Sequence, residues 1–196
     1  MREARKERKT AETEIRLELR VDGSGQREIR TSCGFMNHML ELMSYHARFD
    51  LKVEGRGDIE VDDHHLVEDL GILLGDALKE ALGEKKGIKR YGQSLLPMDE
   101  SLVLCGVDVS GRAYLGFDVN MPQATVGSFD TELVEEFFQA FVRSSGMTLH
   151  LKLLSGRNTH HVIEAIFKAF GRALRDATGQ DASFAEEVPS TKGVLE

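Results

Sequence analysis

The sequence predicts an α/β (α+β) fold made of two tandem, pseudo-symmetric β-β-α-β-α halves, with their sheets packed on helices. Segments with strand and helix periodicity alternate, they do so twice in the same order, and one motif recurs. Asp-His-His-Leu-Val-Glu at 63–68 matches Thr-His-His-Val-Ile-Glu at 159–164, an offset of 96 that also aligns Gly75 with Gly171. A recurring motif within recurring elements indicates an internal duplication. We therefore expect residues 1–93 and 94–196 to form two half-repeats of one compact unit.

Apolar periodicity and turn signals define the elements of the first half. Apolar residues alternate from Ile15 to Val21, which is typical of a half-buried strand. The Asp-Gly-Ser-Gly turn at 22–25 predicts a hairpin with the next strand. The further elements are expected at 27–31 (strand), 35–46 (helix), 49–53 and 58–61 (strands) and 64–82 (helix). Residues 55–57 are interpreted as a turn, and residues 1–9 as a solvated arm without the apolar segment of a signal peptide.

The second half repeats this order. A strand at 102–109 and its partner at 112–119 are predicted to form a hairpin around the Ser-Gly turn at 110–111. A helix at 133–143, a strand at 148–154 and a helix at 159–177 follow.

Composition limits the classes of function. The chain has 196 residues, of which 41% are hydrophobic, and its net charge of −8 disfavours nucleic acid as a partner. No apolar run reaches the roughly 20 residues of a membrane span. Cys33 and Cys105 lack metal or redox spacing and indicate reduced thiols in a cytoplasmic protein. A catalytic Cys–His pair is the alternative.

The repeated motif predicts metal binding. Its first His and its Glu are four residues apart and share one face of a helix, whereas the second His points elsewhere. The pairs are His64 with Glu68 and His160 with Glu164, and His38 on an earlier helix is a further candidate. They suggest two metal sites, each of which combines residues of both repeats, from one subunit or from two. Imidazole and carboxylate ligands favour Mn, Fe or Zn. The alternative is that the His pairs only cap helices or satisfy buried polar contacts.

Ordered motifs along nearly the whole chain, from residue 8 to residue 195, resemble those of imidazoleglycerol-phosphate dehydratases. They lie at 8–13 (RKTAET), 35–40 (FMNHML), 62–65 (DDHH), 97–100 (PMDE), 108–112 (DVSGR), 156–161 (GRNTHH) and 189–195 (PSTKGVL). Such a series is far more specific than either His-His pair alone.

The resemblance implies a fold, a reaction and an assembly. The fold is that of the second domain of ribosomal protein S5. The reaction is that of a carbon–oxygen hydro-lyase, in which D-erythro-imidazoleglycerol phosphate loses water and gives imidazoleacetol phosphate in L-histidine biosynthesis. The implied cofactor is Mn²⁺, with two ions per active site. The implied assembly is a homo-oligomer of 24 subunits with shared sites.

The resemblance also assigns residues. The implied metal ligands are His38, His64, His65, Glu68, His160, His161 and Glu164. The phosphate group would meet Arg90, Arg112, Lys168, Ser190 and Lys192, and His46 is a further candidate for the substrate pocket. Glu12, His65 and Glu164 are the candidate catalytic groups. Glu12 is the candidate acid or base, contacts the substrate, and is implied to reach the site of a neighbouring subunit.

Two positions depart from the family pattern. Asn37 stands where many members have Asp, so a carboxylate that would raise the basicity of a ligand is missing. Glu136 stands near the pseudo-repeat partner of His38, where some members carry His, and a carboxylate there can still bind Mn²⁺.

Two other classes of function remain open at this point. One is a dinuclear metal hydrolase that releases phosphate, and the other is a non-catalytic protein whose His clusters join subunits. A di-iron helical bundle is disfavoured because its Glu-x-x-His order is the reverse of the order seen here.

Overall fold

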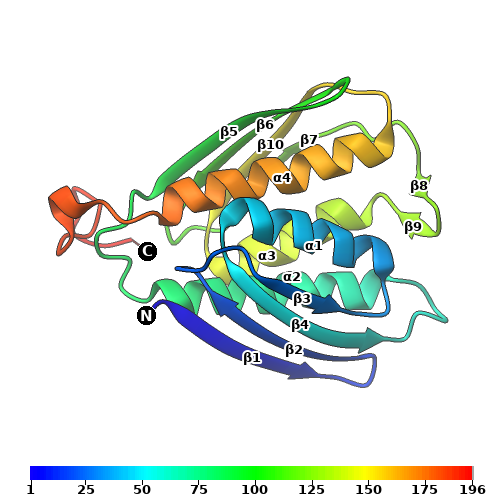
Figure 1. The fold of residues 1–196 in the computed structure, drawn as a ribbon, viewed down its shortest axis with the longest axis horizontal. Coiled ribbons are helices and arrows are strands. Elements are labelled where there is room, and N and C mark those ends of the chain that lie inside the picture. Colours follow the sequence, from blue (N-terminus) through cyan, green and yellow to red (C-terminus); the bar gives the residue numbers. More distant parts are fainter. Residues whose placement is uncertain (196) are drawn as a thin grey trace.

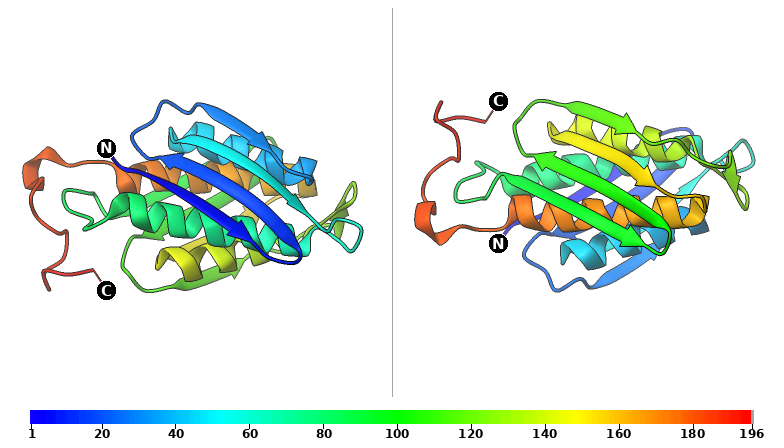
Figure 2. Two further views of the ribbon diagram at one scale, coloured as in Figure 1. Left: turned by 90° about the horizontal axis from the view of Figure 1, so that it is seen from below. Right: turned by 90° about the horizontal axis from the view of Figure 1, so that it is seen from above.

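The computed structural model describes residues 1–195, which form two four-stranded sheets with the helices between them (Figures 1 and 2). The first half comprises β1 (Glu3–Lys9), β2 (Thr13–Arg20), β3 (Arg27–Arg30), α1 (Gly34–Ala47), β4 (Asp50–Gly57) and α2 (His64–Leu82). The second comprises β5 (Tyr91–Met98), β6 (Ser101–Asp108), β7 (Tyr114–Asp118), α3 (Leu133–Ser145), β10 (Thr148–Ser155) and α4 (Thr159–Thr178), with a small ribbon of β8 (Thr125–Val126) and β9 (Phe129–Asp130) before α3. A 3₁₀ helix, η1 (Ala182–Phe184), follows α4.

Both halves have the same topology. The strand order is β1-β2-β4-β3 in one sheet and β5-β6-β10-β7 in the other. The predicted β-β-α-β-α order is therefore confirmed in each half, and one additional strand precedes it. The expectation that residues 1–9 form a solvated arm is wrong, because β1 pairs with β2 along its whole length. Strand β5 was not predicted.

Both predicted hairpins are wrong. Strand β4 lies between β2 and β3, and β3 runs parallel to β4. In the same way β10 lies between β6 and β7. In the first half the cause is Asp50, whose Oδ1 accepts the backbone N–H groups of Ser24 (2.8 Å), Gly25 (3.1 Å) and Gln26 (2.9 Å). This carboxylate holds the predicted turn across the start of β4, so the chain re-enters the sheet on the far side of that strand.

The end of β4 also differs from the prediction. Residues 55–57 are not a turn but continue the strand, and residues 58–61 form a turn rather than a strand. A Cβ on Gly57 would lie 2.9 Å from the Cβ of Leu66. Glycine therefore allows the first turn of α2 to pack directly on β4, and this places the first His-His motif at the edge of the sheet.

One continuous core joins the halves, since α1 packs on α4 and α2 packs on α3. Glycines permit both contacts. A Cβ on Gly171 would lie 2.4 Å from the carbonyl oxygen of Met43, and one on Gly75 would lie 2.6 Å from that of Phe141. Because Gly75 and Gly171 are repeat partners, Met43 and Phe141 are partners too, at an offset of 98. The same offset relates the partner residues His38 and Glu136.

We expect Gly171→Ala to destabilise the fold by about 1–3 kcal/mol, because the added methyl group must push α1 away from α4. Urea denaturation measures this change in the free energy of unfolding. Gly106→Ala is the matched control, since a Cβ there meets no atom within 4 Å. Equal stability of the two variants would show that the α1–α4 contact is not as tight as these distances require.

Within residues 1–195, no helix combines the length and the apolar character needed to cross a bilayer.

Candidate functional site

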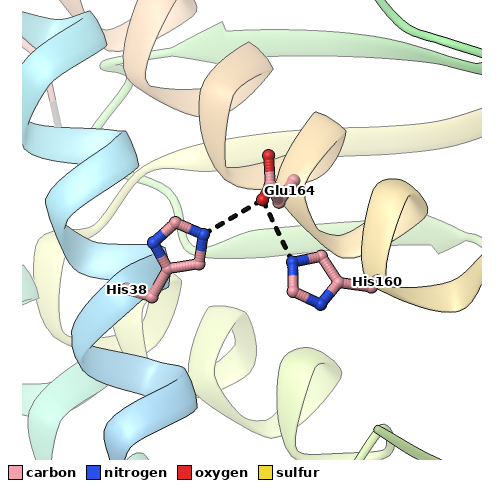
Figure 3. Close-up of side chains that lie close together, drawn as sticks. All are labelled: His38, His160 and Glu164. Carbon is pink, nitrogen blue, oxygen red and sulfur yellow. Dashed lines mark hydrogen bonds and ion pairs between the residues drawn. The ribbon is translucent and has the colours of Figure 1, made fainter.

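A cluster of two histidines and one glutamate joins α1 to α4 (Figure 3). Glu164 Oε1 lies 3.0 Å from His38 Nε2 and 3.1 Å from His160 Nε2. Among residues 1–195 this is the one group of three or more His, Cys, Asp or Glu side chains whose ligand atoms all lie within 4.8 Å of one another. Two imidazoles and a carboxylate form a donor set that suits Mn, Fe or Zn.

Local structure fixes the three side chains. Asn158 precedes α4, and its Oδ1 accepts the backbone N–H groups of His160 (3.0 Å) and His161 (3.4 Å). This cap sets the start of the helix, so His160 and Glu164 share a face as their i, i+4 spacing predicts. On α1, the Asn37 amide bonds to Thr31, accepting its backbone N–H (3.1 Å) and hydroxyl (2.6 Å). The amide of Asn37 therefore ties the start of α1 to the end of β3.

Glu164 is a buried carboxylate that remains charged. Burial raises its pKa, but hydrogen bonds from Lys168 Nζ (2.5 Å), His38 and His160 outweigh burial and lower the pKa to about 2. At neutral pH the group accepts hydrogen bonds and can bind a cation. Lys168 therefore lies beside the cluster, and it also contacts Met98 Sδ at 3.3 Å.

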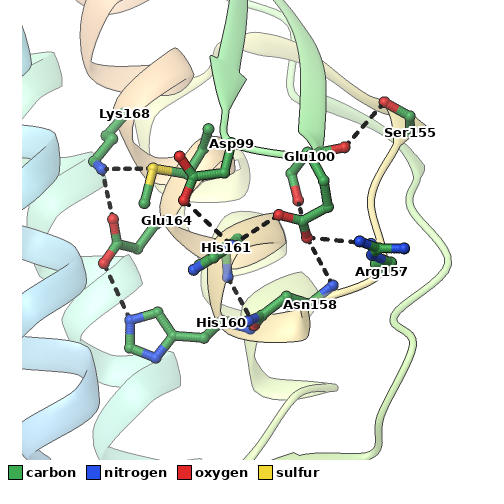
Figure 4. Close-up of polar contacts among 11 residues, drawn as sticks. Asp99, Glu100, Ser155, Arg157, Asn158, His160, His161, Glu164 and Lys168 are labelled. Atoms are coloured by element: carbon green, nitrogen blue, oxygen red, sulfur yellow. Dashed lines mark hydrogen bonds and ion pairs between the residues drawn. The ribbon is translucent and has the colours of Figure 1, made fainter.

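The second histidine of each motif points away from this cluster. His65 Nδ1 lies 3.1 Å from both carboxylate oxygens of Asp58, and His161 Nδ1 lies 2.9 Å from Glu100 Oε2 (Figure 4). These hydrogen bonds raise the pKa of His65 and of His161. Sequence reasoning did not find Asp58 or the role of Glu100.

The first motif does not form an equivalent cluster within one protomer. Glu68 Oε1 accepts a hydrogen bond from Arg143 Nη2 at 3.0 Å. His64 contributes its backbone N–H to Asp62 Oδ1 at 2.8 Å. In the described residues, the structure does not bring His64, Glu68 and Glu136 together into a three-ligand group like that around Glu164.

Four of the five residues assigned to phosphate binding gather at the other end of α4. Arg90 forms an ion pair with Asp108 at 2.8 Å, and its Nη1 donates to the carbonyl oxygen of Pro189 at 3.0 Å. Arg112 follows β6, while Ser190 and Lys192 share a turn in which the Lys192 N–H donates to Ser190 Oγ at 3.2 Å. The backbone N–H of Arg90 donates to the carbonyl oxygen of Ala177 near the end of α4. That helix end is roughly 25 Å along the helix axis from His160.

His46 lies between these two regions, on the last turn of α1 and half-buried. Burial lowers its pKa, and the nearby charges of Lys168 and Arg172 lower it further. The side chain is therefore suited to a neutral hydrogen-bonding role.

Glu12 lies in the turn between β1 and β2, with its side chain 52% exposed and its Oε1 3.8 Å from His65 Nε2. Thr10 Oγ1 accepts the backbone N–H of Glu12 at 3.1 Å. Thr13 Oγ1 donates to the buried carboxylate of Asp69 at 2.5 Å. The turn is held at its backbone, while the described contacts include no hydrogen bond to the Glu12 carboxylate.

Neither cysteine fits a nucleophile. Cys33 and Cys105 are free and buried, and burial raises the pKa of the Cys33 thiol to about 11 and that of Cys105 as well. A thiol with a raised pKa stays protonated and unreactive, which disfavours the Cys–His alternative.

Comparisons with known proteins agree with these features. The family model described as imidazoleglycerol-phosphate dehydratase matches residues 31–174. The imidazoleglycerol-phosphate dehydratase of Desulforamulus reducens is 56% identical over 194 residues, which is 99% of this chain and 98% of the relative. That of Acetivibrio thermocellus is 57% identical over 188 residues, 96% of each chain.

Solved structures show the same likeness. The crystal structure of imidazoleglycerol-phosphate dehydratase from Staphylococcus aureus aligns with a TM-score of 0.84 and 44% identity, covering 91% of this chain and 99% of that chain. The structure of the protein from Pyrococcus furiosus also has a TM-score of 0.84, with 39% identity and coverage of 97% and 100%. The chain therefore belongs to the imidazoleglycerol-phosphate dehydratase family, the hydro-lyases of histidine biosynthesis.

Proposed function

We propose that the chain removes water from D-erythro-imidazoleglycerol phosphate, with two Mn²⁺ ions per active site, in a 24-subunit homo-oligomer whose sites are shared between protomers. The observation that carries the metal dependence is the convergence of His38 and His160 on the charged Glu164 carboxylate. The reduced, buried cysteines support a cytoplasmic location.

The reaction breaks one C–H bond and one C–OH bond of the glycerol arm. The carbon-bound proton and the hydroxyl group leave as water, and the resulting enol becomes the ketone of imidazoleacetol phosphate. The phosphate ester stays intact throughout. The protein must therefore supply a base for a weakly acidic C–H, a proton for the departing hydroxyl group, and a cationic pocket for the phosphate.

The residues present fit the proposed metal. His38, His160 and Glu164 would hold one ion, and His64, His65, Glu68, Glu136 and His161 are the remaining candidate ligands. When bound, Mn²⁺ would supply Lewis acidity to the part of the substrate that reacts.

Glu12 is the proposed proton carrier. Its carboxylate is exposed and lies 3.8 Å from His65 Nε2, while its turn is fixed through Thr10. An acid or base needs a fixed position and a carboxylate that is available to the substrate, and Glu12 has both. Glu164, which accepts hydrogen bonds from three neighbours, is better suited to binding.

The separation of the candidate residues supports shared sites. The residues assigned to phosphate binding near Pro189 lie roughly 25 Å along α4 from the His160 end, too far for one small substrate to contact both. One protomer would thus supply the metal cluster and another the phosphate pocket.

The outer faces of the two sheets differ in a way that supports association. On the first sheet the outward side chains of β2 are charged. The second sheet has several exposed apolar side chains on its strands, namely Tyr91, Leu95, Leu104, Tyr114 and Leu154. Apolar patches on a protein surface commonly mark interfaces, and a second copy of this chain is the proposed occupant.

The test is turnover of imidazoleglycerol phosphate by the purified protein as isolated, after chelation, and after Mn²⁺ is restored. We expect imidazoleacetol phosphate to form, its formation to stop with the chelator, and Mn²⁺ to restore it. Release of inorganic phosphate would instead indicate the hydrolase. A change in particle size on chelation, without turnover by the loaded protein, would indicate the assembly protein.

A further inference from the structure

Two carboxylates outside the proposed ligand set make matching contacts with the second histidine of each motif. Asp58 lies in the turn after β4 and contacts His65, whereas Glu100 lies in the turn between β5 and β6 and contacts His161. Both contacts are made to Nδ1, at 3.1 and 2.9 Å. In each ring Nε2 is the other nitrogen and takes no part in the contact.

A carboxylate at Nδ1 selects one tautomer of a neutral imidazole. An ionised carboxylate only accepts hydrogen bonds, so Nδ1 must carry the proton and Nε2 must present its lone pair. A carboxylate on the remote nitrogen also fixes the ring orientation and raises the basicity of the ligand nitrogen. Burial alone would provide neither effect.

The internal duplication shows that the two contacts do not descend from one ancestral pair. The pair Arg20–Asp50 of β2 and β4 is equivalent to the pair Asp108–Thr148 of β6 and β10, so the offset is 88 between β2 and β6 and 98 at the start of β4 and β10. The register of β10 shifts between Leu153 and Ser155, and the offset is 99 beyond that point. The repeat partner of Asp58 is therefore Arg157, and the partner of Glu100 is Glu12. The two halves therefore place a carboxylate at the same ring atom from different positions in the repeat.

The second half has Arg157 at the position equivalent to Asp58. A guanidinium group has no acceptor for a hydrogen bond from a ring N–H. Glu100 reaches Nδ1 of His161 from the neighbouring turn, and it also accepts the backbone N–H of Arg157 at 3.4 Å.

Glu100 is also fixed far more firmly than its repeat partner Glu12. Its Oε1 accepts the backbone N–H groups of Asn158 (2.9 Å) and Arg157 (3.4 Å), and its Oε2 contacts His161 (Figure 4). Glu12 has a half-exposed side chain that lies at 3.8 Å from His65 Nε2. Equivalent glutamates thus serve different purposes, one orienting a histidine and the other available for proton transfer.

We propose that Asp58 and Glu100 are positioning residues that hold His65 and His161 as Nδ1–H tautomers, so that Nε2 of each ring is presented to the metal. This inference rests on the proposed function, because it assigns a purpose to the two rings within the same site.

The first experiment measures the Mn²⁺ dissociation constant of the full-length protein by isothermal titration calorimetry. We expect Asp58→Asn and Glu100→Gln each to weaken binding by roughly 10- to 100-fold. Glu60→Gln and Asp99→Asn are matched controls, since each removes one exposed charge from the same turn without removing a hydrogen bond to a ring. Asn also tolerates the positive φ of Asp99, 48°. Wild-type affinity in Asp58→Asn and Glu100→Gln would overturn the inference.

A second measurement needs no variant and so does not depend on how the variants fold. Long-range ¹H–¹⁵N spectra of the metal-free protein with ¹⁵N-labelled histidine, recorded at a pH where the rings are neutral, report the tautomer of each ring. We expect His65 and His161 to carry the proton on Nδ1, and Asp58→Asn and Glu100→Gln to supply the assignment. Protonation at Nε2 in the wild type would overturn the inference.

The two proposals can fail separately. If the wild type binds Mn²⁺ and the variants bind it more weakly, but no dehydration occurs, the proposed function fails and the positioning role stands. If the wild type dehydrates the substrate and the variants keep its metal affinity, the positioning role fails alone.

Discussion

Replacing Glu164 with glutamine is expected to lower kcat for dehydration by at least about 100-fold, because a metal ligand is lost. Glu164 is 8% exposed, and its carboxylate accepts hydrogen bonds from His38, His160 and Lys168. A neutral amide of the same shape cannot balance the charge of Lys168 or of a bound ion. The metal therefore loses a charged ligand, and the surrounding hydrogen-bond donors lose their common acceptor. Steady-state kinetics at saturating Mn²⁺ and metal content of the purified variant measure the effect.

Glu135→Gln is the control for this substitution, because Glu135 is an exposed glutamate on α3. It should retain the activity and metal content of the wild type. Activity of Glu164→Gln within a few-fold of the wild type, at full metal occupancy, would remove Glu164 from the catalytic site.

Two impaired variants are expected to recover part of the wild-type activity when they share one assembly. Glu164→Gln disables the metal cluster, and Lys192→Ala removes a proposed phosphate contact worth about 1.5–3 kcal/mol, or roughly 10- to 100-fold in kcat/KM. If each site takes its cluster and its phosphate pocket from different protomers, a randomly mixed assembly contains about one intact site in four. The two variants, carrying different tags, are co-expressed and purified through both tags, and kcat/KM is measured at low substrate concentration.

The outcome distinguishes shared from self-contained sites. Assemblies of either variant alone should stay at their low activity, and the mixed assembly should rise well above both. If the mixed assembly only averages the two variants, each site lies within one protomer and the tail reaches its own cluster.

The helices were predictable from sequence because their apolar stripes and repeated motif are local signals, whereas β5 was not. Its inward positions include Gly92 and Ser94 rather than large apolar residues. A Cβ on Gly92 would lie 1.9 Å from the carbonyl oxygen of Ala173, so α4 packs too close for a larger side chain. The alternation that marks a strand is lost for a reason that only the tertiary packing reveals.

Strand β1 and the sheet order were missed for other reasons. In β1, Ala4 is the one buried side chain, and the rest are charged or partly exposed, so the segment resembles an arm. The position of β3 depends on the contact of Asp50 with residues 24–26, about 25 positions earlier in the chain. Contacts between distant residues leave no periodic trace in the sequence.

As with the fold, part of the candidate site could be predicted from the sequence and part could not. Helical spacing predicted that His160 and Glu164 share a face, and the structure adds His38 from α1. Asp58 lies in a segment that was interpreted as a strand, so its approach to His65 had no sequence signal. Glu100 stood in a recognised motif, and the repeat offset that pairs it with Glu12 became visible only from the strand register.

The crosswise packing of α1 on α4 and α2 on α3 also bears on the origin of the chain. An ancestor of half this length would have exposed the helix faces that now pack against the other half. Two identical chains would have had to pair to bury these faces, and the pair would have carried two identical helix-start motifs. Fusion of the gene copies let each motif change alone. Lys168 now accompanies Glu164, while the equivalent position beside Glu68 is Ile72. What began as a symmetric dimer has become a single polypeptide with two differently specialised ends.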